Sequence, residues 1–417
     1  MSWEASWHAA PVPDPGPPPQ PGPLAPLRER NYRLFFGGNL VSNLGTFCQT
    51  IAQALFVFQL TGSTFLVGVV GFAQFAAVPV LAPLAGSVAD RFDRRTVLVA
   101  AQLSACGFSA VLTVLAAGGW ANAPMVIGLA ACIGVTGAFA FPVARAFAPS
   151  LVSERNLGRA INLDSVSVNI ARALGPVAGA VIVDRAGVAW AFGINTATYF
   201  VLVAALAAVQ PARQVTPPAR SRFRDGFAVL RRRPLLALLL FIVASCAIGA
   251  DPPVTLGPEL AQRFGGGDQL AGVILGAFGA GGVTGAFVAG AESSRHHRKV
   301  ARLLALLVLG LALFAFSGAL PFTLAGSFLA GFGYLTAQTR TSTLLVRSIA
   351  DSERGRIMAL WSIAFVGTRP LASLVDGFVG DRFGLRVATL AMAVPAAAAC
   401  AVSLVLDRRA LRADASV

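Results

Sequence analysis

Apolar runs of membrane-spanning length recur from residue 34 onward and are separated by short polar or charged loops. Each run holds about 20 residues, the length that an α-helix needs to cross the hydrocarbon core of a bilayer. We place twelve spans, at residues 34–58, 64–86, 97–118, 123–146, 160–183, 188–209, 234–255, 269–291, 301–318, 322–344, 357–380 and 385–406. The pattern therefore predicts an all-α membrane protein with twelve transmembrane helices.

The composition excludes a soluble protein. Of the 417 residues, 56% are hydrophobic and 12% are charged, whereas soluble domains carry about 25% charged residues. A soluble chain of this length needs many more charged side chains to cover its surface. A soluble enzyme and a nucleic-acid-binding domain are therefore excluded, although the net charge of +14 taken alone would suit nucleic acid.

The basic residues are distributed unequally between the two sides of the membrane. Segments on the same side as the N-terminus hold 25 of the 33 Lys and Arg residues, and segments on the opposite side hold four. In membrane proteins it is the short cytoplasmic loops that carry such an excess of basic residues. The distribution predicts that both termini lie in the cytoplasm. We expect a multi-pass protein of a bacterial inner (plasma) membrane.

The second half of the sequence repeats the first. At an offset of 197 residues, Arg172 matches Arg369, and the stretch 184–187 matches 381–384. Charged positions align as well as apolar ones, as expected for two parallel six-helix repeats related by an axis along the membrane normal. We therefore predict two pseudo-symmetric six-helix lobes. The expected boundaries are a disordered Pro-rich tail at 1–26, an N-terminal lobe at 27–209, a cytoplasmic linker at 210–233, a C-terminal lobe at 234–408 and a C-terminal tail at 409–417.

The loop between spans 2 and 3 reads GSVADRFDRR from residue 86 to residue 95. It resembles the signature loop of the major facilitator superfamily, G-x-x-x-D-[RK]-x-G-[RK]-[RK]. The matching residues are Gly86, Asp90, Arg91, Arg94 and Arg95. The loop departs from the family pattern at Asp93, where the family has Gly, and the second copy has Ser294 in place of the acid. The resemblance covers residues 27–408 and implies a transporter with the major facilitator fold rather than an enzyme.

This resemblance implies that the loop gates the cytoplasmic side. In the family the corresponding acid locks the two halves together near the start of span 11, which is the role expected for Asp90. A carboxylate at a helix end can accept hydrogen bonds from the exposed amides of a facing helix, and arginines bind anionic lipid headgroups. The alternative is that the arginines of the loop only set the topology.

Span 5 contains the sequence RALGPVAG at residues 172–179. It is similar to the G-P-x-x-G motif of facilitator-type exporters, and the residues assigned to this motif are Arg172, Gly175, Pro176 and Gly179. Proline kinks a helix, and two glycines one turn apart permit close helix packing. The motif favours export over import, and the alternative is a packing kink alone. Span 4 lacks the Arg of a second exporter motif, because its Arg145 lies at the cytoplasmic end.

Three short stretches point to one branch of the superfamily. RNYRLF at residues 30–35, QLTGS at 59–63 and PSLV at 149–152 resemble the group that contains enterobactin exporters and macrolide-efflux proteins. The resemblance implies a drug- or siderophore-like cargo.

Polar side chains inside spans are costly, so they are candidates for function. With Arg172, the candidates for the cavity or for coupling are Asp251, Arg369, Asp376, Asn43, Gln53 and Asn169. Arg172 and Arg369 lie near mid-span at matched positions, where both lobes would line a central cavity. Their charge would favour substrates with carboxylate or catecholate groups, and a proton on Asp251 or Asp376 would change that field.

Structural roles are the alternatives for these residues. Each arginine can instead form hydrogen bonds between helices, and Arg369 can pair with Asp376, which lies two helical turns further on. Asp251 precedes Pro252-Pro253, where span 7 must break. It can therefore act as a gate, take up a proton or simply cap the bend.

No cofactor or metal site is expected. The single lysine, Lys299, precedes Val300, so the chain has no phosphate-binding G-x-x-x-x-G-K-[ST] loop. The five cysteines fall in apolar runs, and the three histidines lie in the N-terminal tail and one loop, which fits no metal-ligand spacing. The expected partners are a small-molecule substrate, the lipid bilayer and protons, without nucleic acid, and the protein is expected to function as a monomer.

These patterns together predict a secondary active transporter that exports a small organic molecule by alternating access, coupled to protons. Two alternatives stay open. One is an importer of a small metabolite with the same fold, and the other is a membrane receptor or assembly partner that does not transport.

Overall fold

The computed structural model describes residues 22–210, 230–291, 297–349 and 353–414. Within these ranges every regular element is a helix, which confirms the all-α prediction. Ten of the described helical segments are long and apolar enough to cross a membrane, and α11 and α12 occupy two further predicted spans. Most of the tail predicted at 1–26 and of the linker predicted at 210–233 lies outside the described residues, so the domain boundaries stay predictions.

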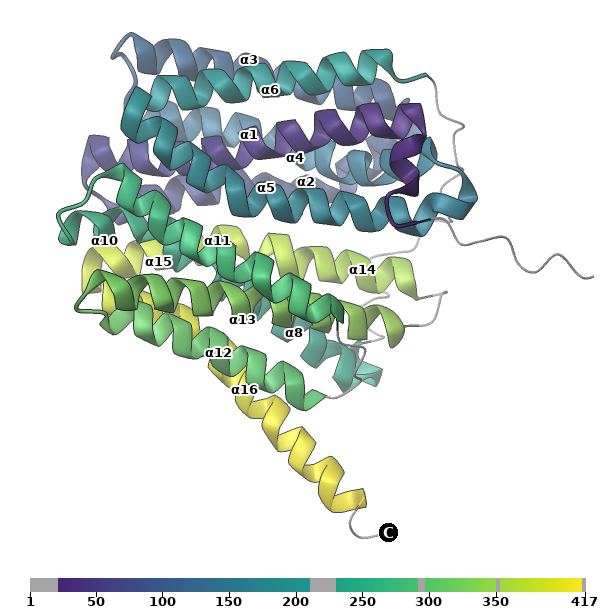
Figure 1. Cartoon of the computed structure of the whole chain (residues 1–417), viewed down its shortest axis with the longest axis vertical. Coiled ribbons are helices and arrows are strands. Elements are labelled where there is room, and N and C mark those ends of the chain that lie inside the picture. The colour runs from purple at the N-terminus through teal and green to yellow at the C-terminus, as the bar shows by residue number, and fades with distance from the viewer. Residues whose placement is uncertain (1–21, 211–229, 292–296, 350–352, 415–417) are drawn as a thin grey trace, which may run out of the picture.

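Six long helices from the first half of the chain pack against one another (Figure 1). They are α1 (Arg30–Thr61), α2 (Thr64–Arg91), α3 (Arg94–Ala117), α4 (Ala123–Phe147), α5 (Leu157–Ala186) and α6 (Val188–Ala208). Side chains cap three of these helices, because the first backbone amides of a helix have no partner within it. Ser63 caps α2, Asp93 caps α3 and Asn122 caps α4.

The second half forms another bundle (Figure 1). Its helices are α8 (Pro234–Gly249), α9 (Pro252–Thr255), α10 (Gly257–Arg263), α11 (Asp268–Ala291), α12 (His297–Phe316), α13 (Leu320–Arg347), α14 (Arg354–Ser362), α15 (Arg369–Phe383) and α16 (Leu385–Asp414). The predicted break in span 7 is confirmed: α8 ends at Gly249, and Asp251 directly precedes α9. Pro252 and Pro253 cause the break because neither has an amide proton to continue the helix.

Span 11 is present but is not one continuous α-helix. A π-helical turn at Ile363–Gly367 separates α14 from α15, and Arg369 is the first residue of α15. Pro370 follows it and is tolerated in the first turn of a helix, where the missing amide proton has no partner to lose. The turn therefore places Arg369 at a helix start in the middle of the span.

The sequence repeat is visible in the backbone. Gly187 after α5 has φ +90° and Gly384 after α15 has φ +85°. These residues match at the offset of 197, and glycine is the residue that adopts such angles without steric cost. The two bundles meet along two matched helix pairs, α2 with α15 and α5 with α11.

Candidate functional site

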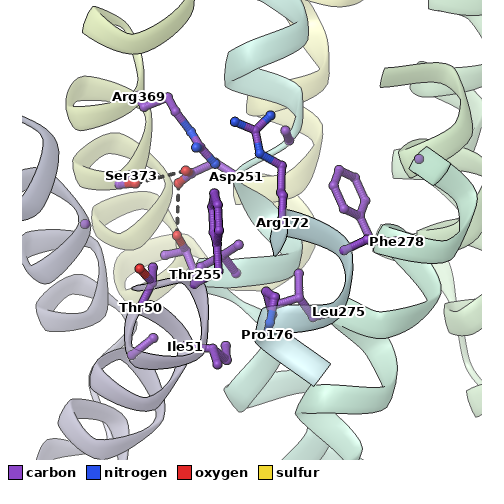
Figure 2. A pocket seen from close by; sticks show the side chains of 18 of the residues that line it. Thr50, Ile51, Arg172, Pro176, Asp251, Thr255, Leu275, Phe278, Arg369 and Ser373 are labelled. Carbon is purple, nitrogen blue, oxygen red and sulfur yellow. Dashed lines mark hydrogen bonds between the residues drawn. The ribbon is translucent and has the colours of Figure 1, made fainter. Parts of the chain in front are cut away.

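The two bundles enclose two adjoining cavities, with volumes of about 220 Å³ and about 90 Å³. Six residues line both cavities: Phe47, Thr50, Gln74, Phe75, Arg172 and Arg369. These residues come from α1, α2, α5 and α15, so both halves of the chain contribute to the wall. We call the joined space the central cavity, and Figure 2 shows its smaller part.

Arg172 extends from α5 into the central cavity (Figure 2). Its Nη1 donates a hydrogen bond of 2.8 Å to the hydroxyl of Tyr334. The guanidinium carbon lies 5.7 Å from the ring centre of Phe47 and 5.4 Å from that of Phe365, within the range of cation–π attraction. Its Nε has no hydrogen-bond partner among the described residues, so Arg172 keeps a donor for a ligand.

Arg369 lines the same cavity from the second half. Its guanidinium carbon lies 5.2 Å from the ring centre of Phe75, and its charge acts on both Arg172 and Asp251. Figure 2 shows the Arg369 side chain extending toward the carboxylate of Asp251. Two positive charges therefore lie where the two cavities join, and one carboxylate faces them.

Asp251 is held in place by two hydroxyl groups. Ser373 Oγ donates to one carboxylate oxygen and Thr255 Oγ1 donates to the other, each at 2.9 Å. The residue is only 3% exposed, yet it lines the smaller cavity. Asp251 precedes α9 without a side-chain capping hydrogen bond, and it presents an oriented carboxylate to the cavity.

A second pair of charges, Arg145 and Asp164, lines the larger cavity. Asn39 Nδ2 donates a hydrogen bond of 3.3 Å to Asp164, and the Arg145 guanidinium carbon lies 4.6 Å from the ring centre of Phe141. The sequence pattern gave Arg145 no site role, because an arginine at a span end usually sets topology.

The predicted amides and Asp376 divide into two groups. Asn43 lines the larger cavity and Asn169 the smaller one. Gln53 and Asp376 line neither cavity, although both are fully buried. Arg369 and Asp376 form no ion pair within the described part of the chain, so the arginine faces the cavity instead of this acid.

Aromatic rings form much of the cavity wall, and the sequence did not reveal them. Phe47, Phe75, Phe278, Phe365 and Tyr334 all line it. The chain has 29 Phe residues spread over its spans. A ring that faces a cavity cannot be told from one that faces lipid until the rotation of its helix is known.

The span 5 motif packs α5 against its own bundle. A Cβ added at Gly175 would lie 2.6 Å from Phe47 Cβ, and one added at Gly179 would lie 2.6 Å from the Cys48 carbonyl oxygen. No larger side chain fits at either position without moving α1. Pro176 lines the smaller cavity beside them. The motif thus fixes the depth at which Arg172 enters the cavity.

The signature loop joins the start of α3 to two neighbouring helices. Arg94 donates a hydrogen bond of 3.2 Å to the Ala146 carbonyl, and Arg95 donates one of 2.7 Å to the Ala207 carbonyl. Arg91 is exposed. Asp93, the departure from the family pattern, caps α3 by accepting from Thr96 N at 2.9 Å. The surroundings of Gly86 and the side chain of Asp90 lie outside the described part, so the locking role of Asp90 stays a prediction.

The cavity is closed on the side opposite the two termini, by what we call the seal. The seal consists of the contact of Thr64–Gly71 of α2 with Ser373–Asp381 of α15, and the contact of Ala173–Ala180 of α5 with Gly272–Gly279 of α11. A Cβ added at Gly377 would lie 2.6 Å from the Thr64 carbonyl oxygen, and one added at Gly279 would lie 2.9 Å from the Ala173 carbonyl oxygen. Small residues therefore allow the two bundles to meet backbone to backbone.

Hydrogen bonds across the bundles reinforce the seal at its outer rim. Asp381 of α15 accepts from the backbone N–H of Thr64 at 3.2 Å, at the N-terminus of α2. Asp268, at the start of α11, accepts from Gln59 Nε2. Burial raises the pKa of the Asp268 carboxyl; the hydrogen bond from Gln59 opposes this rise, and the charge of Asp184 adds to it.

Comparison with known proteins identifies the fold and the family. The profile of a family described as transmembrane secretion effectors matches residues 21–416. Enterobactin exporter EntS of Shigella flexneri is 26% identical over 375 residues, which cover 84% of this chain and 85% of that protein. EntS of Shigella boydii serotype 4 is 25% identical over 374 residues with the same coverage.

Solved structures share the fold at low sequence identity. A bacterial homologue of the human lysosomal transporter Spinster has a TM-score of 0.72 at 14% identity, covering 92% of this chain and 98% of its own. The nucleoside transporter NupG has a TM-score of 0.70 at 16% identity, covering 90% and 99%. These relatives are transporters rather than enzymes, and the relationship makes this chain a multi-pass inner-membrane protein. The chain belongs to the transmembrane secretion effector family of the major facilitator superfamily, in the branch of the enterobactin exporters.

Proposed function

We propose that this transporter exports an anionic, aromatic-rich small molecule by alternating access. The observation that carries the proposal is the pair of arginines, Arg172 and Arg369, which meet from the two bundles at the junction of the two cavities. Guanidinium groups bind carboxylate and catecholate oxygens through charge-assisted hydrogen bonds. The surrounding phenylalanine rings supply apolar area for a flat ligand.

The asymmetric closure of the cavity supports alternating access. The seal closes the side opposite the termini, and the larger cavity extends from Arg172 toward Asn39 and Arg145, near the termini side. With the termini in the cytoplasm, as the excess of basic residues on their side supports, this conformation is the inward-facing state. A cargo from the cytoplasm then binds in the cavity, and opening of the seal releases it on the outer side.

Siderophores are the substrate class that the relatives favour. The curated relatives are named enterobactin exporters, and the two arginines suit an acidic or catecholate cargo better than a permanently cationic drug. Export over import rests on the same relatives and on the span 5 motif. Proton antiport is the proposed energy source, because the chain carries no phosphate-binding loop for ATP and because the membrane potential acts directly on charges inside the membrane.

The test measures efflux in a strain that lacks its own siderophore and drug exporters. Cells expressing the protein are loaded with catecholate siderophores or with cationic macrolides, and their retention is compared. We expect the cells to lose the catecholates faster than the macrolides, and we expect a proton uncoupler to abolish this difference. Uptake instead of loss would identify an importer. No movement of any compound, at normal membrane insertion, would favour a receptor or assembly role and refute the proposal.

A further inference from the structure

Asp376 is a buried acid that the cavity does not use. It lies on α15 with 0% of its surface exposed, and both carboxylate oxygens lack a hydrogen-bond partner among the described residues. A carboxylate removed from water without a partner costs so much free energy that the group takes up a proton instead. The position therefore suits a neutral carboxyl group in the conformation with the seal closed.

A second acid lies beside Asp376. Ser373, one helical turn earlier on α15, donates a hydrogen bond to Asp251, and the charge of Asp251 acts on Asp376. Asp251 differs in its surroundings, because it accepts two hydroxyl hydrogen bonds, faces Arg369 and lines the cavity. Two neighbouring acids of this kind do not both ionise readily, so they hold one proton between them.

Among the described residues, no other charged group is as close a neighbour of Asp376 as Asp251 is. The remaining titratable groups among the described side chains of the helices that pack against α15 are Arg91 of α2, Cys246 of α8, Arg369, Asp381 and Arg382 of α15 itself, and Arg386 and Cys400 of α16. The stretch of α2 that faces α15, Thr64–Gly71, has no titratable side chain. Arg369 lies two turns away and is directed to the cavity (Figure 2). Asp381 and Arg382 lie at the far end of α15, where Asp381 binds Thr64.

Residues on both sides of Asp376 along α15 take part in the seal. Ser373 and Gly377 meet the backbone of α2 at Gly68 and Thr64. Separation of α2 from α15, which opening of the seal requires, uncovers this part of α15. Asp376 then gains contact with the side opposite the termini, whereas Asp251 retains contact with the cavity when the seal is closed.

We propose that Asp376 and Asp251 form one proton-binding site. When the seal is open the pair takes up a second proton at Asp376, and when the seal is closed Asp251 releases one proton to the cavity while Asp376 stays neutral. This assignment names the coupling site of the proposed antiport and so rests on the proposed function. The proton site itself, however, consists of residues of the protein alone, so its protonation can be measured without any substrate.

The first experiment detects the neutral acid by infrared spectroscopy. The full-length protein in lipid membranes is examined at neutral pH for the carbonyl band of a protonated carboxyl group, in an Asp268→Asn background that removes the partly buried acid of the seal rim. Expected is a band that Asp376→Asn abolishes. The matched control Asp93→Asn, at an exposed helix cap, leaves the band unchanged. A band that persists in Asp376→Asn at full height overturns the assignment.

Asp251→Asn provides a second variant if Asp376→Asn fails to fold. Removing the neighbouring negative charge makes ionisation of Asp376 easier, so its band is expected to disappear at a pH lower by about one unit or more. An unchanged titration of the band would show that the two acids do not interact and would overturn the shared site.

The last measurement separates this inference from the proposed function. Protein in liposomes is exposed to a pH jump, and proton entry is followed with an internal pH dye while efflux of a catecholate is recorded in parallel. Expected is loss of proton movement in Asp376→Asn with the arginines intact. If the infrared band is present but no catecholate is transported, the proton site stands and the export proposal is refuted. Normal proton-driven transport in Asp376→Asn would refute the coupling role of the acid pair and leave export standing.

Discussion

Gly68 of α2 offers the sharpest test of the seal. An added Cβ would overlap the Ser373 carbonyl oxygen and lie 3.1 Å from the carbonyl carbon of that residue and 3.2 Å from Gly377 Cα. Because carbon atoms pack best at about 3.5–4.0 Å, Gly68→Ala forces α2 and α15 apart by roughly 0.5–1 Å. Both clashing groups belong to the backbone, so no side chain can rotate to relieve them.

The cost of this overlap falls on the closed conformation alone. Overpacking a well-packed contact costs about 1–3 kcal/mol, and a difference of that size changes an equilibrium by a factor of about 5–150. We therefore expect Gly68→Ala to shift the population toward an open seal by at least fivefold. The helix itself gains stability from alanine, which separates this effect from unfolding.

Distance measurements between spin labels report the state of the seal. Labels at Leu60 and Phe383, both exposed near the seal rim, are placed in a cysteine-free background. Gly68→Ala is expected to increase the longer-distance population. The control is Gly107→Ala in α3, where an added Cβ meets nothing within 4 Å. Distance distributions that are identical for both variants would refute the assignment of this contact as the closed gate.

Four further outcomes follow from the charged residues and the tail. Substituting Arg172 or Arg369 by Gln should reduce efflux of an anionic compound at least tenfold while sparing a cationic one; equal loss of both would indicate a structural role. Asp90→Asn should insert normally and transport more slowly, and a wild-type rate at equal expression would remove the gating role. Because the pKa of Asp268 is raised in the closed seal, closure is favoured most below the ordinary Asp pKa of about 3.9. Closure should weaken as the external pH rises to the raised pKa, and Asp268→Asn should remove that part of the pH dependence of the label distances. Deleting residues 1–24 should change neither insertion nor efflux, and loss of activity would show that this tail docks.

The span pattern predicted the fold because the bilayer fixes both the length and the composition of each helix. It also located the break in span 7, where two prolines follow Asp251. It did not locate the π-helical turn in span 11, because Pro370 alone does not distinguish a kink from a helix start. Several predicted spans are also shorter than their helices: α1 begins at Arg30, before the apolar run at 34–58. Polar residues extend these helices beyond the apolar runs.

Polar and charged residues inside the spans predicted part of the candidate site. Arg172, Arg369, Asp251, Asn43 and Asn169 line the cavity. Gln53 and Asp376 do not, although their side chains gave the same signal. Which face of a helix meets the cavity depends on packing between distant segments, such as Gly175 against Phe47. A single sequence does not contain that rotation. Even a charged residue does not settle it, because Arg172 faces the cavity whereas Asp376 lies outside it.

The two arginines follow the sequence repeat between the two halves of the chain, whereas Asp376 does not. Arg172 and Arg369 match at the offset of 197 and both line the cavity, so the two bundles contribute equally to the positive centre. At the same offset Asp376 matches Gly179, where contact with Cys48 leaves no room for a side chain. The first half therefore cannot hold an acid at that position. A ligand that moves between two sides needs a binding site shared by both bundles, whereas a proton needs only one acid that changes its surroundings. In the proposed mechanism, the ligand therefore binds at the interface between the bundles and the proton binds in the second bundle.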